Sequence, residues 1–218
     1  INIHLMCGLE ENTFHTSRLS ITRCNIRETY SNQPSKAKLD YATIHYNQLI
    51  LEKMYYRSLL HTSSPHILNS THMKQCVQLC KSWSKSHFLS SNSTYYCKLT
   101  NFHFTMILSH LYSIKKIVNQ MSCYQLFRAV MVFLTQDKCS VIYGKSNDLI
   151  AFKYTQQDLH TLQSFRQSFT AVFLDKSQQL NIFAHLNTIA YKNIQYEAKK
   201  TLNALDSTVE DYFSSIFL

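Results

Sequence analysis

The sequence predicts a mainly α-helical protein, a bundle of four to five helices with one small β-hairpin. Glycine and proline are scarce, with two of each among 218 residues, whereas the many tight turns of a β-sandwich or barrel use both. Long stretches instead repeat apolar residues at the three- and four-residue spacing of a helix face. The scarcity also excludes phosphate loops, dinucleotide-binding turns and nucleophile elbows, because each needs glycines where the backbone meets a ligand.

The N-terminal half is predicted to contain an arm, a helix and a loop. Residues 1–36 form an irregular arm that ends near Pro34, and residues 37–218 form one helical domain. Residues 38–61 contain neither glycine nor proline and are predicted to form the first helix. Residues 64–98 are polar, so we expect a long loop there with one short helical piece over 72–83.

The C-terminal half carries the strongest helical patterns. Residues 101–121 and 123–136 are predicted helices, the second strongly apolar and therefore central. Two short apolar runs flank Gly144 and predict a β-hairpin near residues 140–154. The stretch Thr155–Gln156–Gln157–Asp158 is similar to a capping box and opens a further helix. A long C-terminal helix is expected over 177–216.

The net charge of +9 comes from one segment. Between Glu52 and Asp137 there is no carboxylate but there are nine basic residues, including the adjacent pair Lys115 and Lys116. Such a segment would attract an acidic protein surface, a sulfated glycan, a nucleic acid or an anionic membrane. A solvated basic face without a dedicated partner is an equally open interpretation. No apolar run approaches the ~18 residues of a transmembrane segment.

Seven cysteines and two glycosylation sequons, at Asn69 and Asn92, favour an oxidising compartment. The odd count leaves one thiol for a partner chain or as a free group. The alternative is a set of reduced, buried cysteines in an intracellular protein. Cys76 and Cys80 lie one helical turn apart, and a disulfide role is favoured over a metal site because no second pair has zinc spacing. The chain begins at Ile1, which indicates a removed leader or a truncated chain.

The residues suggest neither catalysis nor a cofactor. No paired carboxylates or metal-binding motif appear on structured elements, and no cysteine–histidine pair is favoured over another. His103 and His110 are expected on the surface. Nucleic-acid binding has some support because tyrosines and Trp83 interleave with basic residues. It is ranked lower because basic runs are short and because the cysteines and sequons fit a nuclear protein poorly.

Three stretches resemble the interleukin-12 alpha-chain family of long-chain, interleukin-6-like helical cytokines. They are Asn92–Ser93–Thr94 with Cys97 and residues 106–112, residues 132–136 with Val141 and Ile142, and residues 152–155 leading to Leu159, Leu162, Phe165 and Arg166. The chain departs from the family in its cysteine spacing and in its longer C-terminal region. The resemblance implies that Cys80 bonds to a soluble receptor-like partner and that Arg166 lies near that interface.

The sequence thus favours a secreted, glycosylated, cytokine-like binding protein, with Cys80, Arg166, Lys115 and Lys116 as partner-binding residues. A secreted or viral accessory glycoprotein that binds a host receptor is an alternative. The alternative of another class is a basic helical subunit of a large intracellular or organellar assembly that could contain RNA. An enzyme ranks last.

Overall fold

The structure, a computed structural model, describes residues 9–10, 13–23, 43–63, 65–88, 99–136, 159–175, 177–207 and 216–217. These residues confirm the mainly helical class. The elements are η1 (Thr16–Leu19), α1 (Ile44–Ser63), α2 (Pro65–Asn69), α3 (Thr71–Phe88), α4 (Asn101–Ser113), α5 (Cys123–Thr135), α6 (Leu159–Ser168) and α7 (Thr188–Leu205). The hairpin predicted over 140–154, Asn92 and most of the arm over 1–36 lie outside the described residues.

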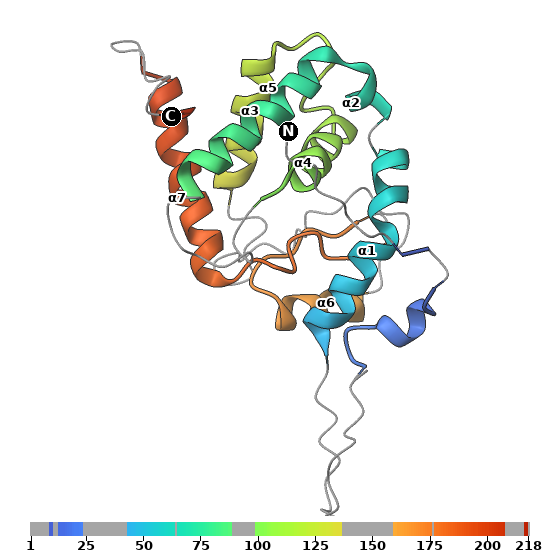
Figure 1. Ribbon diagram of the computed structural model, residues 1–218. Coiled ribbons are helices and arrows are strands. Elements are labelled where there is room, and N and C mark those ends of the chain that lie inside the picture. Colours follow the sequence, from blue (N-terminus) through green and yellow to red (C-terminus); the bar gives the residue numbers. More distant parts are fainter. Residues whose placement is uncertain are drawn as a thin grey trace, which may run out of the picture.

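Helices α2 to α5 gather at one end of the molecule, α7 runs along one side, and α1 descends the other side toward α6 (Figure 1). Helix α5 packs against α7 and α3, while α4 contacts α1, α2, α3 and α5. Helix α4 is therefore central, and its ten residues from Phe102 to Leu111 are all buried. A smaller apolar cluster, built on Phe165 of α6 and on Phe169 directly after it, joins that helix to Ile21 and to α1.

Helix α4 ends at Ser113, eight residues before the predicted end at 121. The amide of Lys116 donates to the Leu111 carbonyl at 2.9 Å and that of Lys115 to the Tyr112 carbonyl at 3.0 Å. This hydrogen-bond pair is a Schellman motif, which needs a left-handed residue that is usually glycine. Here Lys115 takes that conformation, with φ of 59°. A search for glycine therefore does not find this end of α4.

The first part of the loop predicted over 64–98 is helical well beyond the short piece predicted over 72–83. Residues 65–69 and 71–88 form α2 and α3. Helix α3 buries Met73, Cys76, Cys80 and Trp83 completely and leaves its opposite face polar. The helix is therefore stabilised by packing of one narrow apolar face, although its mean composition is polar.

The long helix predicted over 177–216 is also wrong at its start. Helix α7 begins at Thr188, where the side chain of Asn187 caps it by accepting from the Ala190 amide at 2.8 Å. The preceding residues carry Leu180, Ile182 and Phe183 into the core without regular secondary structure. Their apolar spacing fits a helix, but the chain is bent there by side-chain hydrogen bonds.

Two buried polar residues make that bend. Asp175 accepts from the amides of Gln179 and Leu180 at 3.2 and 3.0 Å, and from Ser177. Asn181 donates through its side chain to the Ala171 carbonyl at 2.9 Å and accepts from the amides of Phe173 and Phe183. The Asn181 amide donates to the Gln48 side chain of α1. Buried backbone groups must find such partners when no helix or sheet supplies them.

We expect N181A to destabilise the fold by about 2–4 kcal/mol, because it removes the Asn181 hydrogen bonds of two buried backbone amides and one buried carbonyl. Urea unfolding followed by circular dichroism would measure the change. N193A, at an exposed position of α7, is the matched control and should change stability by less than about 0.5 kcal/mol. Equal effects of the two substitutions would contradict the role given to Asn181.

Candidate nucleic-acid interface

The carboxylates of the described residues are mostly used inside the structure. Asp175 is buried in its turn, and Glu52 is half-buried, with a pKa raised by burial. Glu197 lies 3.5 Å from the His87 ring nitrogen and 3.9 Å from the Lys200 ammonium. The exposed surface is therefore more basic than the composition alone indicates.

Asp206 forms an ion pair with Arg128. Both of its oxygens accept from the Arg128 guanidinium, at 3.0 and 3.1 Å, so the C-terminal end of α7 is held to α5. This contact raises the pKa of Arg128 and lowers that of Asp206 through the hydrogen bond and the opposite charge. Arg128 is thereby removed from the set of basic residues available to a partner.

One exposed arc of α7 carries no carboxylate, and we call it the α7 outer face. The apolar residues Ala190, Ile194 and Ala198 bury the other side of the helix. Tyr196 lies near the middle of the arc and is 67% exposed, and Ile189 is 72% exposed. The α7 outer face consists of Ile189, Lys192, Asn193, Tyr196, Lys199, Lys200 and Asn203.

A second basic surface lies on α3. Lys74, Lys81 and Lys85 recur at intervals of seven and four residues and are exposed, so they form one stripe along the helix. We call it the α3 lysine stripe. Gln78 lies within it, and no aromatic residue of α3 is exposed beside it.

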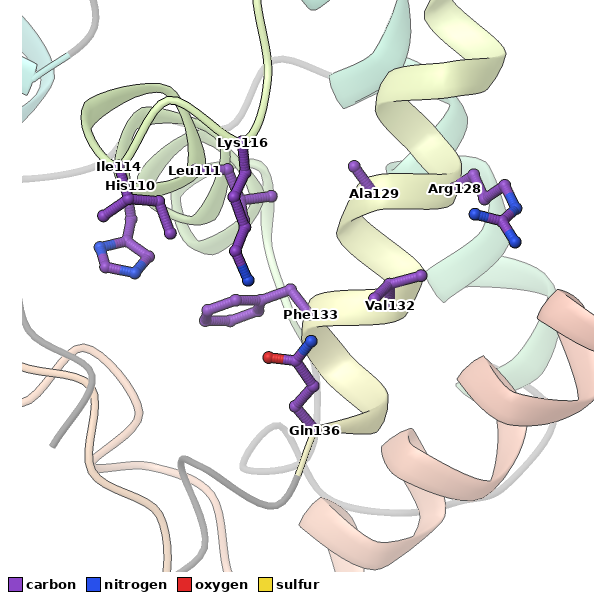
Figure 2. Close-up of a pocket in the computed structure, with 9 residues that line it drawn as sticks. All are labelled: His110, Leu111, Ile114, Lys116, Arg128, Ala129, Val132, Phe133 and Gln136. Carbon is purple, nitrogen blue, oxygen red and sulfur yellow. The ribbon is translucent and has the colours of Figure 1, made fainter. Parts of the chain in front are cut away.

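The predicted pair Lys115 and Lys116 lies at the end of α4, fixed by the Schellman motif. Both are exposed, but only Lys116 lines a pocket of about 290 Å³ between α4 and α5. Figure 2 shows the polar ends of Lys116 and Gln136 near the Phe133 ring, while Arg128 points away toward α7. This α4–α5 pocket is lined by His110, Leu111, Ile114, Lys116, Arg128, Ala129, Val132, Phe133 and Gln136.

The expectation that His103 and His110 are surface residues is wrong, since only 4% and 5% of them is exposed. His103 accepts from the Thr100 amide through Nδ1 at 2.9 Å and so caps α4. Its pKa lies well below the usual value because of burial and the neighbouring His185. Burial and the charge of Lys116 lower the pKa of His110 to about 4. Both imidazoles are neutral at neutral pH.

The structure also corrects the role given to Cys80. Cys76 and Cys80 are free, fully buried thiols on the core side of α3. Burial and the neighbouring Cys76 raise the pKa of Cys80 well above its usual value. An intermolecular disulfide at Cys80 would require the core to open. Arg166 is half-buried on α6, and Asn69 is exposed at the end of α2.

Of the aromatic residues that suggested base stacking, Tyr95 and Tyr96 lie outside the described residues, and the other three are not exposed. Trp83 is fully buried and donates to the Thr201 hydroxyl at 2.8 Å. Tyr55 and Tyr56 are half-buried against the core. The exposed Tyr196 was missed because acidic and basic residues balance outside the 53–136 segment. The sequence did contain a signal, because the residues of the α7 outer face lie between the regularly spaced apolar residues of the last predicted helix.

Within the described part of the chain, no three histidine, cysteine or acidic side chains lie close enough to hold a metal ion. No helix of that part is both long and apolar enough to cross a membrane. What these residues do present is exposed cations, several exposed aromatic side chains of which Tyr196 lies among lysines, and the small mixed α4–α5 pocket. This arrangement suits an anionic, partly aromatic ligand.

Comparison with known proteins identifies the family. Residues 72–218 match the family described as the Nrap protein PAP/OAS-like domain. The chain belongs to this family. It is 31% identical over 206 residues to nucleolar protein 6 of Xenopus tropicalis and 28% identical over 205 residues to that of Mus musculus, covering 94% of the chain in each case. It is 26% identical over its whole length to the U3 small nucleolar RNA-associated protein 22 of Saccharomyces cerevisiae.

Membership of the Nrap family overturns the resemblance to interleukin-12 alpha-chain cytokines. That resemblance depended on apolar helix positions, which recur in unrelated helical proteins. The expectations of a secreted glycoprotein, a receptor partner and a minor place for nucleic acid are wrong as well, because the relatives are nucleolar and one is RNA-associated by name. The chain spans less than a fifth of the length of these relatives, 17% and 18%.

We expect the buried histidines to make this Nrap domain sensitive to mild acid. In the unfolded chain the His110 imidazole takes up a proton near pH 6.5, whereas in the fold it stays neutral down to about pH 4. Neutral His110 therefore leaves the fold at full stability above pH 6.5, and stability is lost as the pH falls from 6.5 to 4. From pH 7 to 5, His110 alone should lower the free energy of unfolding by about 2 kcal/mol.

Urea unfolding at several pH values would test this. H110F keeps an aromatic ring beside Phe133 and Phe173 and should reduce the loss, whereas H72F at an exposed position should not. An unchanged pH dependence in H110F would contradict the assignment.

Proposed function

We propose that this chain is a non-catalytic RNA-binding domain of a nucleolar assembly and that it holds single-stranded RNA on the α7 outer face. The observation that carries the proposal is the α7 outer face itself, with three lysines around one exposed tyrosine and only the partly buried Glu197 beside it, 3.9 Å from the Lys200 ammonium. The relatives support it, because nearly the whole chain is similar to nucleolar proteins, one of them RNA-associated by name.

The spacing of the α7 outer face suits a nucleic-acid strand. An α-helix of 18 residues is about 27 Å long, enough to follow several nucleotides. Lys192 precedes Tyr196 by one turn, and Lys199 and Lys200 follow it by one turn. A tyrosine offers a π-face to any base, and lysines on either side neutralise phosphates before and after that base. Binding of this kind tolerates different base sequences.

The α3 lysine stripe is the weaker candidate. It carries as many lysines as the α7 outer face and equals it in long-range attraction. It lacks an exposed aromatic side chain, so it would neutralise phosphates without stacking a base. We therefore assign to it a general contribution to the field around the domain and not the RNA path.

The absence of catalysis is part of the proposal. The buried carboxylate of Asp175 is saturated by hydrogen bonds that make a turn, and His103 is committed to capping α4. Neither presents a proton-transfer group to a bound ligand at hydrogen-bond distance, as general acid–base catalysis requires. Asp175 and His103 thus have structural roles.

Replacing Lys192, Lys199 and Lys200 with glutamine should weaken binding of a fluorescent single-stranded RNA 12-mer. Because each phosphate contact on a single strand contributes about 0.7 to the salt dependence, the slope of log K against log salt should fall by roughly 2. Fluorescence anisotropy at several salt concentrations measures both quantities. The matched control is the glutamine triple variant of the α3 lysine stripe, with the same charge change. Equal losses in the two variants would overturn the assignment to α7.

Y196A should reduce affinity about 5- to 150-fold, because stacking of one base on an aromatic side chain contributes roughly 1–3 kcal/mol. The salt slope should stay as in the wild type, since no charge is removed. Y124A, which removes an exposed tyrosine of α5 instead, is the control and should leave the affinity unchanged. A Y196A variant with unaltered affinity would show that α7 holds phosphates only.

A further inference from the structure

We propose that the α4–α5 pocket binds one nucleotide of single-stranded RNA, with the base against the apolar wall and the phosphate at Lys116. The inference rests on the proposed function, because the RNA held by the domain would supply the nucleotide. It concerns a different surface, since the pocket lies on the α4 side of α5 whereas the α7 outer face lies on the opposite side of α7 from the core.

The size of the pocket favours a single nucleotide. Its volume of about 290 Å³ lies just below the roughly 300–1,000 Å³ found for small-molecule sites. Such a volume accommodates one planar ring system with its attached group and not a stack of several bases. The position between α4 and α5 is also rigid, since both helices are part of the main core.

The lining has the mixed chemistry that a nucleotide requires. Ile114, Val132 and Phe133 provide an apolar wall for the faces of a base. The Gln136 side chain carries both a donor and an acceptor for the edge of a base. The neutral imidazole of His110 adds one donor and one acceptor nitrogen.

The charge of the pocket selects an anion. Lys116 is exposed and lines the pocket, and no lining residue is a carboxylate. The ammonium is close enough to His110 to act on its titration through space. Arg128 also lines the pocket but is engaged by Asp206, so Lys116 supplies the positive charge for a ligand there. An ammonium is an effective point charge for phosphate.

The neighbouring lysines provide a matched test. K116Q and K115Q each remove one positive charge at adjacent exposed positions, but only Lys116 lines the pocket. Binding of adenosine and uridine 5′-monophosphates, measured by NMR titration of the wild-type chain, should shift amides of α4 and α5. K116Q should weaken this binding about tenfold, the loss of one charge-assisted contact, and K115Q less than twofold.

A second variant keeps the test independent of charge. A129M adds a side chain to the pocket wall and should abolish nucleotide binding while the thermal unfolding midpoint shows that the chain is folded. Equal effects of K116Q and K115Q, binding that A129M leaves intact, or equal binding of inorganic phosphate would overturn the proposal. Preferential binding of an acidic, leucine-containing peptide in the pocket would also overturn it.

The outcomes for the two surfaces are separable. If the pocket fails, K116Q and A129M will bind the RNA 12-mer with wild-type affinity while the α7 triple variant still loses it. If the proposed function fails, the α7 triple variant will bind that RNA normally, whatever the mononucleotides do in the pocket.

Discussion

The hydrogen bonds of Asn181 and Asp175 are the constraint on which the rest of the structure depends. They allow residues 170–175 and 177–187 to cross the core without helix or strand while Phe173 and Phe183 remain buried. The bond from the Asn181 amide to Gln48 fixes this segment to α1. The segment in turn sets where α7 begins and which of its faces meets α5. The exposed arc with Tyr196 is therefore a consequence of a buried polar network.

The charge of the surface also depends on which side chains the fold buries and which it exposes. The chain has few carboxylates, and the fold uses those of Asp175, Glu197 and Asp206 for a turn, a histidine contact and an ion pair. Lysines remain outside because their ammonium groups keep their hydration there. A modest net charge thereby becomes a surface field of one sign over α3 and α7. Such a field speeds encounters with a polyanion before any specific contact forms.

Sequence patterns predicted the helical class and the apolar core of α4 and α5, because periodic burial is a local property. They could not predict the break before α7. Leu180, Ile182 and Phe183 would be buried equally well in a helix or in an irregular segment, and residues distant in the sequence, such as Gln48, determine which of the two forms. The end of α4 was missed because Lys115 occupies a position where glycine is usual. The same non-local effect hid the site: whether His110 or Tyr196 is exposed depends on which helix covers it.

The Schellman motif at the end of α4 connects fold stability to ligand chemistry. A left-handed lysine costs about 1 kcal/mol relative to glycine, so the position is stabilised by its surroundings. The motif turns the chain so that Lys115 points to solvent while Lys116 lines the pocket beside His110. A glycine at position 115 would relieve the backbone and preserve Lys116. The pocket therefore depends on the geometry of the turn and not on the number of positive charges, which is why two adjacent exposed lysines of equal charge are expected to differ in function.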